Sequence, residues 1–147
     1  MFLIELVKFY LVVISFFFFA FSASAEEVFT GAAPLEVDKA FLIDHMVTGT
    51  NEVVVRWQIS ENYYLYKKKF IFSSKDFYIE DVIFPASVVK FDDFFGLSEI
   101  YYNLMETTLQ ISPKISGIRM GILEVAYQGC WEGGVCYPLV RKSLQIR

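Results

Sequence analysis

The sequence has few residues that could carry nucleophilic or metal chemistry. It contains only two cysteines, Cys130 and Cys136, and a single histidine, His45. A cysteine–histidine nucleophile pair would depend on His45 alone, and three such residues are fewer than the four ligands of a structural zinc site. The sequence also lacks a Cys-x-x-Cys motif, a haem-attachment motif and a glycine-rich phosphate loop. We therefore expect no metal and no cofactor.

An excess of basic residues is also missing. The chain has 13 Lys and Arg against 17 Asp and Glu, which gives a net charge of −4 at pH 7. A protein that binds nucleic acid through its phosphates presents a basic patch or stripe, and this chain has more acidic than basic residues. We therefore expect no nucleic-acid partner.

The first 25 residues differ in composition from the rest of the chain. They are almost all apolar, with LVVISFFFFAF at residues 11–21, and they end with the small residues Ala23 and Ala25, separated by one residue. This pattern is typical of a secretory signal peptide. An uncleaved membrane anchor is the alternative, but the apolar run is short against the roughly 20 residues that a membrane span needs. We predict a cleaved signal peptide at residues 1–25 and one exported domain at residues 26–147.

The exported part has the pattern of β-strands throughout. Residues 52–59, EVVVRWQI, alternate between the two faces of a strand, with Val53, Val55 and Trp57 on the apolar face. Further candidate strands occur within residues 63–74, 77–85, 107–115, 117–129 and 136–147. No window of a dozen residues has a helical stripe. Short strands between turn residues are typical of an antiparallel sandwich, so the sequence predicts an all-β fold.

The two cysteines flank a turn. Residues 131–135, WEGGV, include two glycines that can adopt positive φ, so Cys130 and Cys136 should lie across a hairpin, close enough to bond. Cysteines of exported proteins are usually paired. A bond here would close a loop of about seven residues, worth roughly 2.5 kcal/mol on the chain-entropy model, across a turn that the hairpin forms anyway. The spacing alone is compatible with a structural staple and with a redox-active pair.

A second unusual stretch is KFDDFFGLSEIYY at residues 90–102. It combines five aromatic residues with acidic residues and a glycine, in what should be a loop between strands. Adjacent side chains of an extended segment point to opposite faces, so Phe94 and Phe95 cannot both face the core there. The loop either packs its aromatic side chains into the core or serves a site.

Four segments occur in an order and at spacings that are typical of one family. They are WQI at residues 57–59, YYLYKK at 63–68, DDFFGLSEIY at 92–101, and YQGC with CYP at 127–130 and 136–138. The five residues between the cysteines match as well. From about residue 37 to its end, the chain therefore resembles the N-terminal periplasmic domain of the DsbD family, the bacterial thiol:disulfide interchange proteins.

This resemblance implies an immunoglobulin-like sandwich with a redox-active disulfide at one end. It implies that Cys136 forms mixed disulfides with partner proteins and that Cys130 resolves them. It also implies a cap loop over the pair, with Phe94 as the shielding ring. The implied cap residues are Asp92, Asp93, Phe94, Phe95 and Gly96, and the residues that line the site are Tyr64, Tyr66 and Val135.

The resemblance also implies a place in an electron relay. The donor is a thioredoxin-like domain, which in the family is the C-terminal domain of the same protein. The acceptors are periplasmic disulfide isomerases and the thioredoxin-like proteins of cytochrome c maturation. We thus expect a periplasmic thiol:disulfide oxidoreductase of the protein-disulfide reductase type, either alone or as one domain of an inner-membrane protein. The alternatives are an immunoglobulin-like binding module with an inert disulfide and a copper(I)-binding thiol pair.

Two positions depart from the family pattern. Position 95 is Phe where the family often has Tyr, and position 135 is Val where an aromatic residue is common. We expect Trp131 to supply the bulk that is missing at Val135. We also expect Asp92 or Asp93 to disfavour the Cys136 thiolate, because a like charge and burial both oppose ionisation.

Overall fold

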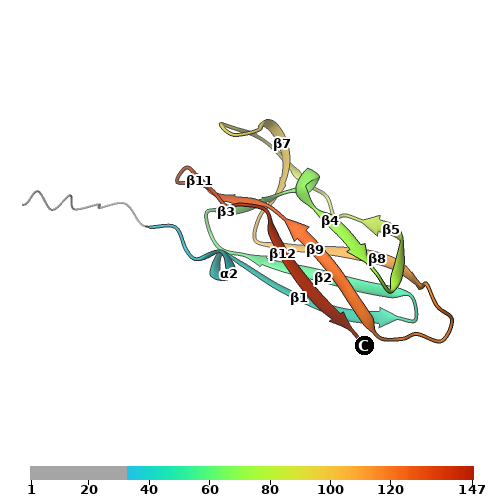
Figure 1. Ribbon diagram of the computed structural model, residues 1–147. Coiled ribbons are helices and arrows are strands. Elements are labelled where there is room, and N and C mark those ends of the chain that lie inside the picture. The colour runs from blue at the N-terminus through green and yellow to red at the C-terminus, as the bar shows by residue number, and fades with distance from the viewer. Residues whose placement is uncertain (1–32) are drawn as a thin grey trace, which may run out of the picture. The chain divides into compact units, whose positions relative to one another are not determined.

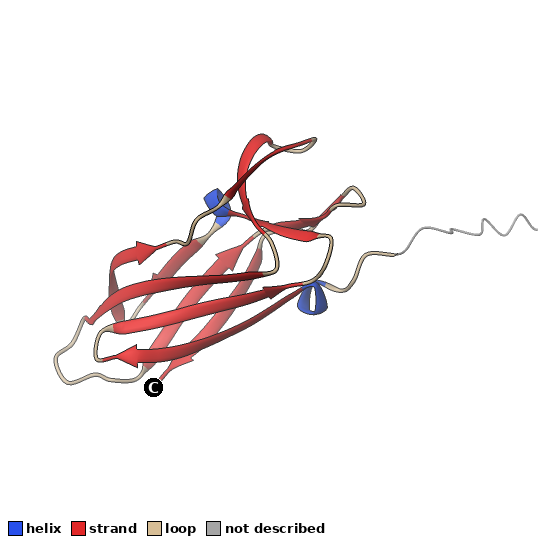
Figure 2. Ribbon diagram, turned by 180° about the vertical axis from the view of Figure 1, so that it is seen from behind, coloured by secondary structure: helices blue, strands red, loops and turns tan. Residues whose placement is uncertain are grey.

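The computed structural model describes residues 33–147, so the predicted signal peptide at residues 1–25 lies outside the described residues. Antiparallel strands form nearly all of the regular secondary structure of the described part, as Figure 2 shows. The helical segments there are α2 (Val37–Ala40) and the 3₁₀ turn η1 (Lys67–Lys69). No helix within residues 33–147 is long and apolar enough to cross a membrane. The predicted all-β antiparallel fold is confirmed.

The strands form three sheets. The first has the order β1 (Phe41–Gly49), β2 (Glu52–Ile59), β8 (Leu104–Pro113) and β5 (Phe77–Ile83). The second has the order β11 (Val135–Cys136), β10 (Gly129–Trp131), β3 (Tyr63–Tyr66), β7 (Gly96–Tyr101) and β6 (Val88–Asp92). The third has the order β12 (Val140–Ile146), β9 (Gly121–Tyr127) and β4 (Ile71–Ser74).

The core lies between the first and third sheets, with β12, β9 and β4 in front of β1, β2 and β8 in Figure 1. The alternation of β2 decides which side chains enter it, because Val53, Val55 and Trp57 are fully buried. The Trp57 ring packs edge-on against Phe70 and Tyr127, at centroid distances of 4.9 and 5.7 Å. The predicted apolar face of this strand is therefore confirmed.

The second sheet forms one end of the sandwich. Its strand β10 follows β9 after a single residue, and β3 pairs with β10 on one side and with β7 on the other. Strands β6 and β7 form a hairpin that stands out from the sandwich at the same end as β11 (Figure 1). Two hairpins from distant parts of the sequence, β6–β7 and β10–β11, therefore flank β3.

Candidate functional site

The two cysteines lie opposite each other in the β10–β11 hairpin. Cys130 pairs with Cys136 in the strand register, their Cα atoms are 4.0 Å apart, and a disulfide joins them. The turn between the strands needs a glycine, since Gly134 has a φ of 91° and donates its N–H to the Trp131 carbonyl at 3.1 Å. The hairpin pairing that the spacing predicted is confirmed.

The two halves of this disulfide differ in exposure. Cys130 is fully buried in a small cluster with Tyr64, Tyr66 and Ile100, separate from the main core. Cys136 packs at the edge of that cluster and is only half-buried. An approaching reactant can therefore reach the disulfide more easily at Cys136 than at Cys130.

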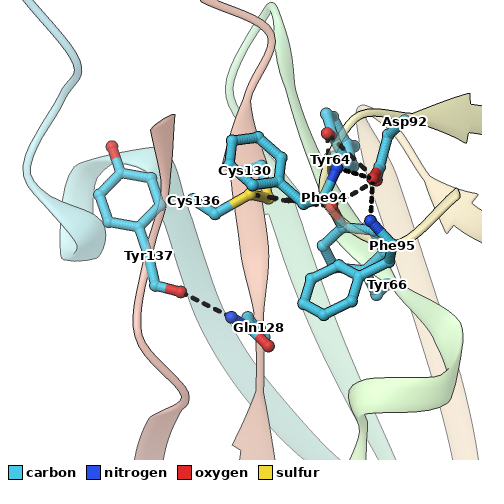
Figure 3. Close-up of a disulfide and its surroundings, with 9 residues drawn as sticks. All are labelled: Tyr64, Tyr66, Asp92, Phe94, Phe95, Gln128, Cys130, Cys136 and Tyr137. Carbon is cyan, nitrogen blue, oxygen red and sulfur yellow. Dashed lines mark hydrogen bonds between the residues drawn. A yellow bond between two sulfur atoms is a disulfide. The ribbon is translucent and has the colours of Figure 1, made fainter. Parts of the chain in front are cut away.

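Tyr66 connects the disulfide to a buried carboxylate. Its hydroxyl oxygen lies 3.1 Å from Cys130 Sγ and 3.8 Å from Cys136 Sγ, and it donates its hydrogen to Asp92 Oδ2 (Figure 3). Tyr64 donates to the same oxygen at 3.5 Å. Burial raises the pKa of Tyr66 far above its ordinary value, and the bond to Asp92 raises it further. Tyr66 is therefore a neutral phenol whose single hydrogen is committed to Asp92.

Asp92 is buried at the end of β6. Its Oδ1 accepts the backbone N–H groups of Phe94 and Phe95 at 2.9 and 2.7 Å. Burial raises the pKa of Asp92, but the bonds from Tyr66 and from these two N–H groups outweigh it, so the pKa lies below its ordinary value. Of the two acids that we expected near the cysteines, Asp92 is buried in this network, whereas Asp93 is exposed.

The predicted cap residues form the turn of the β6–β7 hairpin. Asp92 pairs with Gly96 across a three-residue loop, and Gly96 has a φ of 67°, a left-handed conformation that glycine adopts without strain. The Phe95 ring packs edge-on against Tyr66 at 5.0 Å. Phe94 is half-exposed and points from the loop toward the disulfide in Figure 3. The structure thus brings the loop beside the cysteines, and its role as a cap stays a prediction.

Trp131 and Val135 lie on the other face of the cysteine hairpin. They pair with each other one position away from the cysteines, and neighbours along a strand point to opposite faces. Trp131 stacks on Tyr63 at 6.5 Å, against the main core. Trp131 therefore lies opposite Val135, but both side chains are on the face away from the disulfide, so a role of either residue at the site stays a prediction.

Three residues that the sequence analysis did not assign also meet at the site. Lys90 Nζ lies 2.6 Å from Glu132 Oε1, and the Tyr102 hydroxyl donates to the same oxygen at 2.6 Å. Lys90 and Tyr102 are the two ends of the aromatic and acidic stretch, and Glu132 lies in the turn between the cysteines. Their types and positions were visible in the sequence, but the contact depends on strand order.

Fold and site together define an antiparallel β-sandwich domain that carries a disulfide beside an aromatic hairpin at one end. The family described as "Thiol:disulfide interchange protein DsbD, N-terminal" matches residues 31–146. The chain belongs to this family. Membership and the Cys130–Cys136 disulfide support thiol–disulfide exchange as the general chemistry of the site.

Individual proteins agree with this assignment. The chain is 37% identical over 105 residues to the thiol:disulfide interchange protein DsbD of Pseudoalteromonas atlantica, and the match spans 71% of this chain and 17% of that relative. The Neisseria meningitidis DsbD N-terminal domain in its reduced form matches with a TM-score of 0.67 and 29% identity, over 76% of this chain and 88% of that one. This likeness confirms the immunoglobulin-like sandwich.

A second solved structure contains a partner. It is the complex between the DsbD N-terminal and PilB N-terminal domains of Neisseria meningitidis, which matches with a TM-score of 0.63 and 25% identity. The match covers 78% of this chain and 88% of that one. A domain similar to this chain thus forms a complex with another protein domain.

Proposed function

We propose that the protein takes electrons from a thioredoxin-like donor domain and passes them to periplasmic oxidoreductases through the Cys130–Cys136 pair. The observation that carries this proposal is a disulfide with one buried and one half-buried cysteine, in a chain of the DsbD family. The donor is the C-terminal domain of a DsbD-like protein. The acceptors are disulfide isomerases and thioredoxin-like proteins of cytochrome c maturation. The complex of a related domain with a PilB domain supports partners of this general kind.

The exchange is a two-electron transfer in two displacements at sulfur. A thiolate of the reduced donor attacks Cys136 Sγ, the Cys130–Cys136 bond breaks, and Cys130 leaves as a thiolate that takes up a proton. The second donor thiol loses its proton and attacks the donor sulfur of the mixed disulfide, which releases Cys136. The donor dithiol becomes a disulfide and this protein becomes a dithiol. With an acceptor disulfide the same steps run in the opposite direction, with Cys136 attacking and Cys130 resolving.

The hydroxyl of Tyr66 supports this division of roles. Its hydrogen is committed to Asp92, so the oxygen 3.1 Å from Cys130 Sγ can act as an acceptor. In the reduced protein a Cys130 thiol can donate to it, and both this bond and burial favour the neutral thiol over the thiolate. Cys136, which is half-buried, is then the cysteine that reacts first.

The proposed place of action is the periplasm. The predicted signal peptide at residues 1–25 would direct export, and disulfides persist in oxidising compartments. In such a compartment the dithiol form of the pair can act as a reductant repeatedly only if a donor domain reduces the disulfide again after each turnover. The proposed class is therefore a thiol:disulfide oxidoreductase of the protein-disulfide reductase type.

The reduction potential of the Cys130–Cys136 pair tests the proposed function. We expect a value well above about −300 mV, the level below which structural disulfides of secreted proteins resist reduction by the glutathione pool. The measurement equilibrates the purified protein with glutathione buffers and traps the thiols by alkylation. A value below that level would make the pair a staple and would favour an immunoglobulin-like binding module instead.

Loss of the Phe95 ring should make the disulfide easier to reduce. An edge-on aromatic pair is worth about 1 kcal/mol, so Phe95→Ala should speed reduction by dithiothreitol about fivefold if contact with Tyr66 keeps the loop closed. The measurement follows free thiols after quenching by alkylation. Phe91→Ala is the matched control, because Phe91 belongs to the same hairpin and is 74% exposed. Equal rates for Phe95→Ala and the unaltered protein would contradict a closing role for this ring.

A further inference from the structure

The contact of Lys90, Glu132 and Tyr102 joins the two hairpins of the site. Lys90 lies on β6 and Tyr102 directly follows β7, whereas Glu132 lies in the turn between β10 and β11. Strand β3 separates the two hairpins in the sheet. The ammonium group of Lys90 lies 4.9 Å from the centre of the Tyr64 ring, and Tyr64 pairs with Cys130. The contact therefore crosses the face of the sheet that holds the disulfide.

The Lys90 ammonium and the Glu132 carboxylate stabilise each other's charged form in a partly buried position. The Lys90 side chain is 29% exposed and the Glu132 side chain 37%. The hydrogen bond to Glu132 raises the pKa of Lys90, and the bonds from Lys90 and Tyr102 lower the pKa of Glu132. Glu132 Oε1 accepts from both donors at 2.6 Å. Charge-assisted hydrogen bonds with two donors on one oxygen are stronger than an isolated exposed ion pair.

Two sets of contacts hold the β6–β7 hairpin against the cysteine region, and the contact of Lys90 with Glu132 is one of them. The β6–β7 hairpin also touches the disulfide cluster through Asp92 and Phe95, which both contact Tyr66. Those contacts lie at the tip of the hairpin. Lys90, two residues before Asp92, instead forms an ion pair with Glu132 in the turn between the cysteines. A hairpin that swings away from Cys136 must break both sets of contacts.

We propose that Lys90, Glu132 and Tyr102 form an interhairpin latch that holds the β6–β7 hairpin against the cysteine turn and limits the rate at which reactants reach Cys136. This latch rests on the proposed function, since it assigns positioning residues to the same exchange reaction. None of the three residues attacks or leaves in that reaction. They set how long Cys136 stays covered, and a partner that brings its own contacts to the hairpin would release them.

A double-mutant cycle on the rate of reduction by dithiothreitol tests the latch. Lys90→Met and Glu132→Gln each remove one side of the contact, and each should speed reduction by about fivefold, the order expected for one partly buried charge-assisted contact. The double variant should also be about fivefold faster, since either change alone already opens the latch. Urea unfolding of each variant shows that the rates belong to folded protein.

The direction of the two single effects separates a latch from simple charge attraction. Dithiothreitol reacts as an anion, so loss of the Lys90 charge by attraction alone would slow reduction, while loss of the Glu132 charge would speed it. A latch predicts that both variants are faster. Opposite signs, unchanged rates or effects that multiply in the double variant would each overturn the proposal.

A remote ion pair provides the matched control. Lys142 and Asp38 lie 2.6 Å apart on β12 and α2, the same distance as in the latch. Lys142→Met and Asp38→Asn should leave the reduction rate unchanged. Dithiothreitol needs no protein partner, so these rates test the latch independently of the reduction potential, which tests the electron relay. A low potential with a working latch would refute the proposed function alone.

Discussion

Replacement of Cys136 by serine should abolish mixed-disulfide formation with an oxidised, disulfide-bonded partner, whereas in Cys130→Ser the Cys136 thiolate should attack the partner disulfide, release one partner thiolate and stay bound as a mixed disulfide that Cys130 can no longer resolve. The reason is access, since Cys130 is fully buried beneath Tyr66 and Cys136 is half-buried at the edge of the cluster. Displacement at sulfur needs an open line of approach to the attacked atom. A local opening that costs about 1.4 kcal/mol lowers the reaction rate of a covered thiol about tenfold.

The two cysteine variants serve as controls for each other. Both lose the disulfide and with it roughly 2.5 kcal/mol of loop-closure stabilisation, so a general loss of stability affects them alike. The measurement is the rate of alkylation of the one remaining thiol, followed by mass spectrometry of the adduct that each variant forms with the oxidised form of a thioredoxin-like protein. Faster alkylation of Cys130 in the Cys136→Ser variant would reverse the proposed roles.

Those parts of the fold that depend on local spacing could be predicted from the sequence. The alternation at Val53, Val55 and Trp57 correctly gave the buried face of β2, because a strand has a period of two whatever it pairs with. The cysteine hairpin was equally local, since two glycines follow Trp131 within a short loop. The immunoglobulin-like arrangement of the sheets depends on long-range pairing and came from family resemblance.

The omissions at the site have the same physical origin. The face on which Trp131 and Val135 lie was not predicted, because the strand register places the neighbours of Cys130 and Cys136 on the side away from the disulfide. The contact between Lys90 and Glu132 was missed because the two residues are far apart in sequence and meet only when β6, β7, β3 and β10 align. Neither outcome could be read from residue types without the register of the second sheet.

Asp92 explains why the stretch DDFFG is so unusual in composition. Its Oδ1 shapes the turn through the N–H groups of Phe94 and Phe95, while its Oδ2 accepts the hydrogen of Tyr66. One carboxylate thus serves both the hairpin turn and the phenol next to Cys130. A change in the conformation of the turn would alter the hydrogen bonding of Tyr66, so the loop and the disulfide environment are coupled through a single side chain.

Gly129→Ala should destabilise the protein by about 2 kcal/mol or more, because an added methyl group has no space. A Cβ at this position would lie 2.4 Å from the Tyr64 carbonyl oxygen and 2.6 Å from Phe41 Cζ. The carbonyl belongs to the backbone of β3, which cannot move without separating from β10. Gly129 therefore permits the close approach of two strands that sets Cys130 opposite Tyr64.

The midpoint of urea unfolding of the oxidised protein measures this effect. Gly49→Ala is the matched control, since a Cβ there meets Glu52 Cβ at 3.7 Å, an ordinary contact, and we expect a change within about 0.5 kcal/mol. Equal midpoints for Gly129→Ala and Gly49→Ala would mean that β10 can move away from β3 to admit the methyl group without loss of unfolding free energy. The position of Cys130 under Tyr66 would then need another explanation, because strand spacing would no longer fix it.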